Sequence, residues 1–170
     1  MKLLFIVSII CAGLIAAGSV QSAEIKIDQR YTGVSHPTML DANDDGVFAN
    51  VASFHLVGNP GRATMEGVFE STSFEPGESP CDLQNVPIHQ SYVQTYNDGS
   101  MLFLVGTAGY GCLNLDTSEF WGELSGIITG GIGRFESATG TWTVDVEAFS
   151  VGQTQIVFTG TLQSTVEIPD

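Results

Sequence analysis

Basic residues are scarce in this chain of 170 residues, where five Lys and Arg stand against 19 Asp and Glu. Neutralising nucleic-acid phosphates takes clusters of Lys and Arg. Five basic residues cannot supply such clusters, so the composition excludes a nucleic-acid partner and disfavours an anionic membrane surface. Hydrophobic residues make up 43% of the chain, which predicts a folded core and not a disordered acidic tail. The length favours one domain.

A hydrophobic run long enough to cross a bilayer is also missing, because a spanning helix needs roughly 20 residues. The run at 3–17 follows Lys2 and leads into small and polar residues up to Ala23. This order is typical of a secretory signal peptide. The sequence predicts a signal peptide over 1–23, a mature domain over 24–170 without a membrane span, and a secreted or periplasmic location. A membrane anchor is the alternative for the same run.

Cysteine is rare, with three residues in the whole chain. Removal of the leader takes away Cys11 and leaves Cys81 and Cys112. An even pair in an exported protein predicts a disulfide. The spacing is not the C-x-x-C of a redox motif, and the alternative is two free thiols, one buried and one reactive.

Helical periodicity with caps is absent from the mature chain, whereas period-two alternation recurs throughout it. In 141–147, for example, Trp142, Val144 and Val146 alternate with polar residues. Strands are expected over 24–32, 51–56, 63–71, 89–96, 100–105, 119–128, 141–147 and 153–162. Eight antiparallel strands with one apolar face must close into a barrel or pack as a sandwich. We expect an all-β fold, a single antiparallel eight-stranded β-barrel.

The segment 126–140 is rich in glycine but lacks the third glycine of a dinucleotide fingerprint, since Glu136 stands in that place, and it lacks the lysine of a phosphate loop. Its pattern, GxITGGxGRFxxATG, resembles the signature of the barrel family that contains allene oxide cyclases and dirigent proteins. The resemblance implies an eight-stranded antiparallel barrel, and it departs from the family at Ile132, where threonine is usual. The residues that match the family's barrel corner are Gly130, Gly131, Gly133, Arg134, Phe135, Ala138 and Gly140.

The segment 41–46 matches the first half of a calcium loop, D-x-[DN]-x-[DN]-G. The ligands would be Asp41, Asn43, Asp45 and the carbonyl group of Val47. The twelfth loop position is alanine, so the closing carboxylate would come from a neighbouring strand, with Glu66 and Glu70 as candidates. The alternative is an acidic surface turn without a metal.

Other side chains that could carry chemistry have plainer interpretations. His36, His55 and His89 lack metal-ligand spacing and are expected in turns or strands. The carboxylate pairs Asp145 with Glu147 and Glu66 with Glu70 share strand faces, which usually point to water. Trp121 lies among polar neighbours, either as a partner site or under a loop. No catalytic residue and no required cofactor is predicted.

The sequence leaves three functions open. The first is a secreted, acidic, non-catalytic barrel that has a binding or structural role, with a small hydrophobic ligand as its expected partner. The second is an enzyme similar to the cyclases or dirigent proteins, which would steer a hydrophobic substrate inside the barrel. The third is a calcium-dependent surface or matrix protein. The oligomeric state and the ligand's identity are not fixed by the sequence.

Overall fold

Strands form wherever the sequence alternates between apolar and polar residues. In the computed structural model, which describes residues 22–41, 46–151 and 155–169, ten strands and one short 3₁₀ helix are present. They are β1 (Ala23–Pro37), β2 (Asn50–Asn59), β3 (Gly61–Ser71), β4 (Glu75–Pro76), β5 (Leu83–Asn85), β6 (Pro87–Tyr96), β7 (Met101–Leu113), β8 (Phe120–Ile132), η1 (Gly133–Phe135), β9 (Thr139–Val151) and β10 (Gln155–Ile168). The predicted leader, 1–23, lies outside the described residues except for its last two.

Eight of the described strands close into a ring. In the order β1, β2, β3, β6, β7, β8, β9 and β10, each strand pairs antiparallel with the next, and β10 pairs back with β1. This arrangement confirms the predicted eight-stranded antiparallel barrel. Closure pairs the edges of these strands along most of their length, with one break between β6 and β7, and so leaves little template for edge-to-edge aggregation. Within the described ranges, no helix is long and apolar enough to cross a bilayer.

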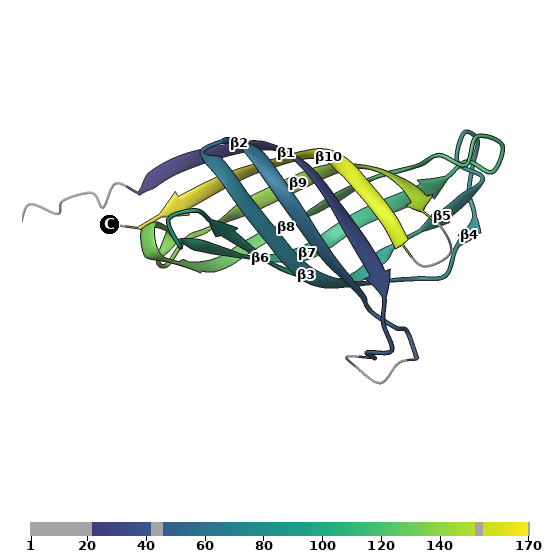
Figure 1. Ribbon diagram of the computed structural model, residues 1–170, viewed down its shortest axis with the longest axis horizontal. Helices are drawn as coiled ribbons and strands as arrows, with labels where there is room; N and C mark the ends of the chain where they lie inside the picture. The colour runs from purple at the N-terminus through teal and green to yellow at the C-terminus, as the bar shows by residue number, and fades with distance from the viewer. Residues whose placement is uncertain (1–21, 42–45, 152–154, 170) are drawn as a thin grey trace, which may run out of the picture.

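The two ends of the barrel differ (Figure 1). At the hairpin end, short connections join β2 to β3, β6 to β7 and β8 to β9, and the C-terminal strand finishes there. At the loop end lie the longer connections, 38–49, 72–86 and 114–119, and the second of these contains β4 and β5. The long connections at the loop end leave room for an opening into the barrel, whereas the short connections at the hairpin end hold neighbouring strands close together.

The alternation of each strand sorts its side chains between the inside and the outside of the barrel. On β9, Trp142, Val144 and Val146 are buried, while Thr143 and Asp145 between them are exposed. The fully buried apolar core includes residues from β1, β2, β7, β10 and η1, and its large members are Ile27, Leu56, Leu102, Leu104, Phe135 and Leu162. The apolar face that the sequence predicted is the inner face of the barrel.

The glycine-rich corner closes the hairpin end. Phe135 and Ala138 are completely buried there. The ring of Tyr96 lies 5.1 Å from the ring of Phe135. The Arg134 guanidinium group covers both rings, at 4.6 and 4.8 Å from their centroids. Gly131 is required beneath this plug, because a Cβ on it would collide with the carbonyl oxygens of Phe135 and Met101.

Asp98 ties the corner to the neighbouring β6–β7 hairpin. Its carboxylate accepts a hydrogen bond from the Ser100 N–H at 3.0 Å and lies 3.0 Å from Arg134. The backbone hydrogen bond from Ser100, helped by Arg134, lowers the pKa of Asp98 below its usual value of 3.8. A lowered pKa means that the folded state favours the ionised carboxylate over the protonated one.

We expect Asp98→Asn to remove a small part of the acid sensitivity of the fold. The contribution of Asp98 is present above pH 3.8 and is lost as the pH falls through its lower folded pKa. The difference between the urea midpoints of wild type and Asp98→Asn should therefore shrink as the pH falls below 3.8. A difference that stays constant with pH would contradict this account of Asp98.

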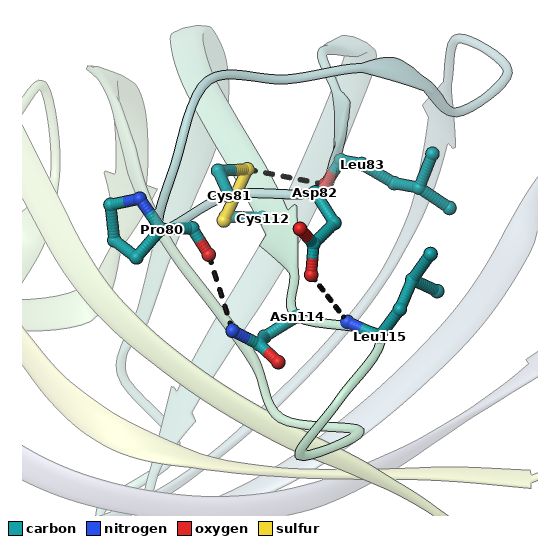
Figure 2. The surroundings of a disulfide bond; sticks show 7 residues. All are labelled: Pro80, Cys81, Asp82, Leu83, Cys112, Asn114 and Leu115. Atoms are coloured by element: carbon teal, nitrogen blue, oxygen red, sulfur yellow. Dashed lines mark hydrogen bonds between the residues drawn. A yellow bond between two sulfur atoms is a disulfide. The ribbon is translucent and has the colours of Figure 1, made fainter.

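The predicted disulfide joins the long connection at the loop end to the barrel wall. Cys81, in the 72–86 connection, is bonded to Cys112 near the end of β7, with the two Cα atoms 5.4 Å apart (Figure 2). Short β5 pairs with the same part of β7, where Gln84 faces Cys112. The connection is thus fixed to the wall both covalently and by a short ladder.

Hydrogen bonds surround this disulfide on both sides (Figure 2). The Asn114 side-chain amide donates to the carbonyl oxygen of Pro80 at 3.3 Å. The Leu115 N–H donates to the Asp82 carboxylate at 2.8 Å. These bonds link the 72–86 connection to the 114–119 connection, so the two loops form one joined rim.

Candidate ligand-binding cavity

A cavity of about 410 Å³ occupies the part of the barrel nearer the loop end. Small-molecule sites in proteins usually measure roughly 300–1,000 Å³, so the volume suits one small molecule. Inward side chains from most of the strands line it, among them Phe54, Phe69, Tyr92, Trp142, Val146 and Phe158. The cavity reaches the surface at the loop end, where Phe48, Phe74 and Phe149 line it and are each about half exposed.

Aromatic rings build a large part of the cavity wall. The ring of Phe54 lies 5.4 Å from Tyr31, 6.4 Å from Tyr92 and 6.2 Å from Phe158, and each contact is edge-to-face. Tyr92 makes a similar contact with Trp142 at 6.2 Å. Edge-to-face pairs stabilise packing beyond the area that they bury, so these contacts stabilise the aromatic wall.

The described lining of the cavity is uncharged. In the described part of the chain, no Asp, Glu, Lys, Arg or His lines the cavity. An isolated ion moved into such a space would lose its hydration without a partner, which is strongly unfavourable. The described lining likewise includes no carboxylate or imidazole that could act as a general acid or base. The cavity suits a neutral, mostly apolar molecule.

Two tyrosine hydroxyl groups at the cavity stay neutral at ordinary pH. Tyr31 donates to the carbonyl oxygen of Asp145 at 3.0 Å, and Tyr92 donates to Oε1 of Gln90 at 3.3 Å. Burial raises the pKa of both hydroxyl groups well above the usual value of 10.0. The tyrosines therefore act as hydrogen-bonding groups and not as phenolate bases.

A polar layer separates the cavity from the Phe135 plug. The Gln94 side-chain amide donates to Oε1 of Gln29 at 2.7 Å and to the Tyr96 hydroxyl at 2.9 Å. Gln29 in turn donates to the carbonyl oxygen of Gly61 at 2.9 Å. These side chains are fully or nearly fully buried, and they do not themselves line the cavity.

The barrel wall is incomplete beside the cavity, between β6 and β7. On one side of the break, Ser91 of β6 pairs with Val105 of β7, and on the other side Asn85 of β5 pairs with Gly111 of β7. The two pairs lie six residues apart on each of the two segments, so the antiparallel register is the same on both sides of the break. Across the described residues 86–90 and 106–110, no ladder pair joins the two strands. A Cβ added to Gly106 would come within 2.5 Å of Nε2 of Gln90. The amide of Gln90 thus fills the space in front of Gly106.

The structure does not test the predicted calcium site, because two of its ligands, Asn43 and Asp45, lie outside the described residues. Asp41 accepts a hydrogen bond from the Gly46 N–H at 2.9 Å. No group of three or more His, Cys, Asp and Glu side chains suited to a metal occurs in the part that the structure describes. The calcium site remains a prediction.

The other sequence candidates lie away from the cavity. His36, His55 and His89 are exposed, as are Asp145 and Glu147. Glu66 is exposed on the outer side of β3. Glu70 is only 2% exposed, and neither of its carboxylate oxygens has a hydrogen-bond partner among the described residues. It follows an inward residue, Phe69, so alternation also places it on the outer side.

Sequence reasoning missed the polar residues of the barrel interior. On β6, Gln90, Tyr92, Gln94 and Tyr96 are all buried and run in order from the cavity to the plug. Alternation in 89–96 does place these four on one face, opposite His89 and its alternate neighbours. The signal that could have found them is the combination of two glutamines and two tyrosines on a single strand face.

Neither a family model nor a curated protein sequence matches the chain. Among solved structures, the chain is similar to the pterocarpan synthase dirigent protein GePTS1, with a TM-score of 0.51 and 9% sequence identity over 88% of this chain and 87% of that one. A second match, Ail, the attachment invasion locus protein of Yersinia pestis, has a TM-score of 0.17 and 14% identity over 87% of this chain and 100% of that one, and it supports no argument. The first likeness shows that this chain has the barrel fold of a dirigent protein.

Proposed function

We propose that this protein is an exported binding protein that holds one neutral, mostly apolar small molecule inside its barrel. The observation that supports the proposal is the cavity of about 410 Å³, whose described lining contains no Asp, Glu, Lys, Arg or His. A rigid aromatic wall lowers the cost of ordering the site when a ligand binds. The disulfide is consistent with an oxidising compartment.

Saturable binding of the uncharged fluorescent probe N-phenylnaphthylamine tests this function. We expect one probe molecule per chain in a fluorescence titration. Ala148 lines the cavity on β9 and is 5% exposed, so Ala148→Phe should occupy ligand space and weaken probe binding by about tenfold or more.

Glu147→Phe is the matched control, because it adds the same side chain one residue away on the exposed face of β9. It should leave the probe affinity unchanged. Equal probe affinity in Ala148→Phe and wild type, with both folded by circular dichroism, would contradict binding inside the barrel.

A second candidate function is an enzyme that steers a reactive hydrophobic substrate by the shape of the cavity. It is favoured by the hydrogen-bonded pair of Tyr92 and Gln90, which lies on the cavity wall and could orient a substrate. The two functions differ in the fate of the bound molecule. Mass spectrometry of a molecule extracted after prolonged binding would show it unchanged for a binding protein and rearranged for an enzyme.

We also propose that the 41–46 loop binds calcium weakly, as its sequence predicts. Sites of extracellular modules have dissociation constants around 10⁻⁴ to 10⁻³ M. Calcium at ten times the dissociation constant would then stabilise the fold by about 1.4 kcal/mol. We expect the melting temperature to rise with calcium and to fall in a chelator, and identical melting curves would remove this proposal.

A further inference from the structure

Gln90 is the most deeply buried amide that faces the cavity. It lies on β6, lines the cavity and is only 5% exposed. A side-chain amide carries two N–H donors and one carbonyl acceptor. Burying such donors without acceptors is unfavourable unless something satisfies them. The hydrogen-bond partners of its carbonyl oxygen and of its NH₂ group therefore indicate which chemical group a ligand in the cavity must offer.

Only the carbonyl end of this amide is satisfied within the described residues. Oε1 accepts the hydrogen bond from the Tyr92 hydroxyl, which orients the amide and directs Nε2 away from Tyr92. Nε2 is next to Gly106, in the stretch where β6 and β7 share no ladder pair. Nε2 donates to no acceptor in the described part of the chain, and it is not among the fully covered atoms, so a partner can still reach it.

A second N–H donor of the cavity lining is also without an acceptor. Nε1 of Trp142 is buried and has no hydrogen-bond partner among the described residues. Trp142 packs edge-to-face on Tyr92, whose hydroxyl group is bonded to Gln90. The wall around Tyr92 thus holds two N–H groups without an acceptor among the described residues, and an acceptor on a ligand would satisfy the one on Gln90.

We infer that the ligand carries a carbonyl oxygen and that Nε2 of Gln90 donates a hydrogen bond to it. The inference rests on the proposed function, since it names the chemistry of the molecule that the cavity holds. A ketone, an aldehyde or an ester fits, because each brings an acceptor without a donor or a charge. A carboxylate does not fit, because the described lining offers no cation to compensate it.

Two probes that differ only in the carbonyl group test the inference. Benzophenone and diphenylmethane have the same two rings, joined by a carbonyl group in one and by a methylene group in the other. Their affinities are measured by displacement of N-phenylnaphthylamine. We expect benzophenone to bind about fivefold to tenfold more tightly than diphenylmethane, as one additional hydrogen bond to an otherwise unsatisfied donor predicts.

The variant Gln90→Leu should abolish this preference by weakening benzophenone alone. Met65→Leu is the matched control, because Met65 lines the cavity without a polar group and is 5% exposed. It should keep the preference. An unchanged ratio of the two affinities in folded Gln90→Leu would overturn the role of Gln90.

Infrared spectroscopy of bound benzophenone tests the contact even if Gln90→Leu does not fold. A hydrogen bond to the carbonyl oxygen lowers its stretching frequency relative to benzophenone in an alkane solvent. An unshifted band, or equal affinity for the two probes in wild type, would overturn the inference and leave the proposed function standing. Failure of all three probes to bind would instead overturn the proposed function.

Discussion

Replacing Phe135 by alanine is expected to destabilise the barrel by about 3–5 kcal/mol. Phe135 is completely buried at the hairpin end, with Tyr96 on one side and the Arg134 guanidinium group over its ring. The space cannot easily collapse, because the backbone at Gly131 already packs closely against Phe135. Truncation would therefore leave a cavity in addition to removing buried apolar surface. Urea unfolding followed by circular dichroism measures the loss.

Phe149→Ala is the control for this truncation. Phe149 is 52% exposed, so its loss should cost under about 1 kcal/mol. A cost for Phe135→Ala as small as that of Phe149→Ala would show that the corner does not hold the end of the barrel together. The glycine-rich pattern would then need another explanation.

Removing the disulfide, as Cys81→Ser with Cys112→Ser, is expected to cost about 3–4 kcal/mol. The bond closes a loop with a sequence separation of 31, and the chain-entropy relation gives this magnitude for such a loop. The same change should weaken probe binding, because the 72–86 connection supplies Thr72, Phe74 and Asn85 to the cavity lining. Urea unfolding and probe titration of the double variant measure both effects.

Reduction of the wild-type protein provides an independent control for the cysteine substitutions. Reduced wild type and the double serine variant should unfold at the same urea concentration, below that of the oxidised protein. Equal midpoints for oxidised and reduced wild type would contradict a stabilising role for the disulfide. The ladder between β5 and β7 and the hydrogen bonds at Pro80 and Asp82 would then suffice to hold the connection.

Local alternation made most of the barrel predictable. The eight long strands, the buried face of 141–147 and the disulfide between Cys81 and Cys112 are all present in the structure. The extent of β7 was underestimated, since the prediction ended at 105 and the strand continues to Leu113. Residues 106–111 are rich in glycine and lack alternation, and it is pairing with β8 that keeps them extended. β4 and β5 are too short to leave a pattern.

The cavity could not be predicted, because its volume depends on which inward side chains meet across the barrel. Phe54 on β2 and Phe158 on β10 contact each other although they are far apart in the sequence. The break between β6 and β7 is likewise a property of two distant segments. Composition permitted either a filled or a hollow barrel, and only the three-dimensional arrangement distinguishes the two.

Intermolecular nuclear Overhauser effects between the protein and N-phenylnaphthylamine show whether one neutral molecule binds inside the barrel. We expect contacts from the probe to the methyl groups of Val144, Val146 and Leu162, which line the cavity. Ile127 and Ile132 are about half exposed on β8 and do not line it, so they should show none. Contacts to Ile127 or Ile132 without contacts to the cavity methyl groups would show that the probe binds outside the barrel.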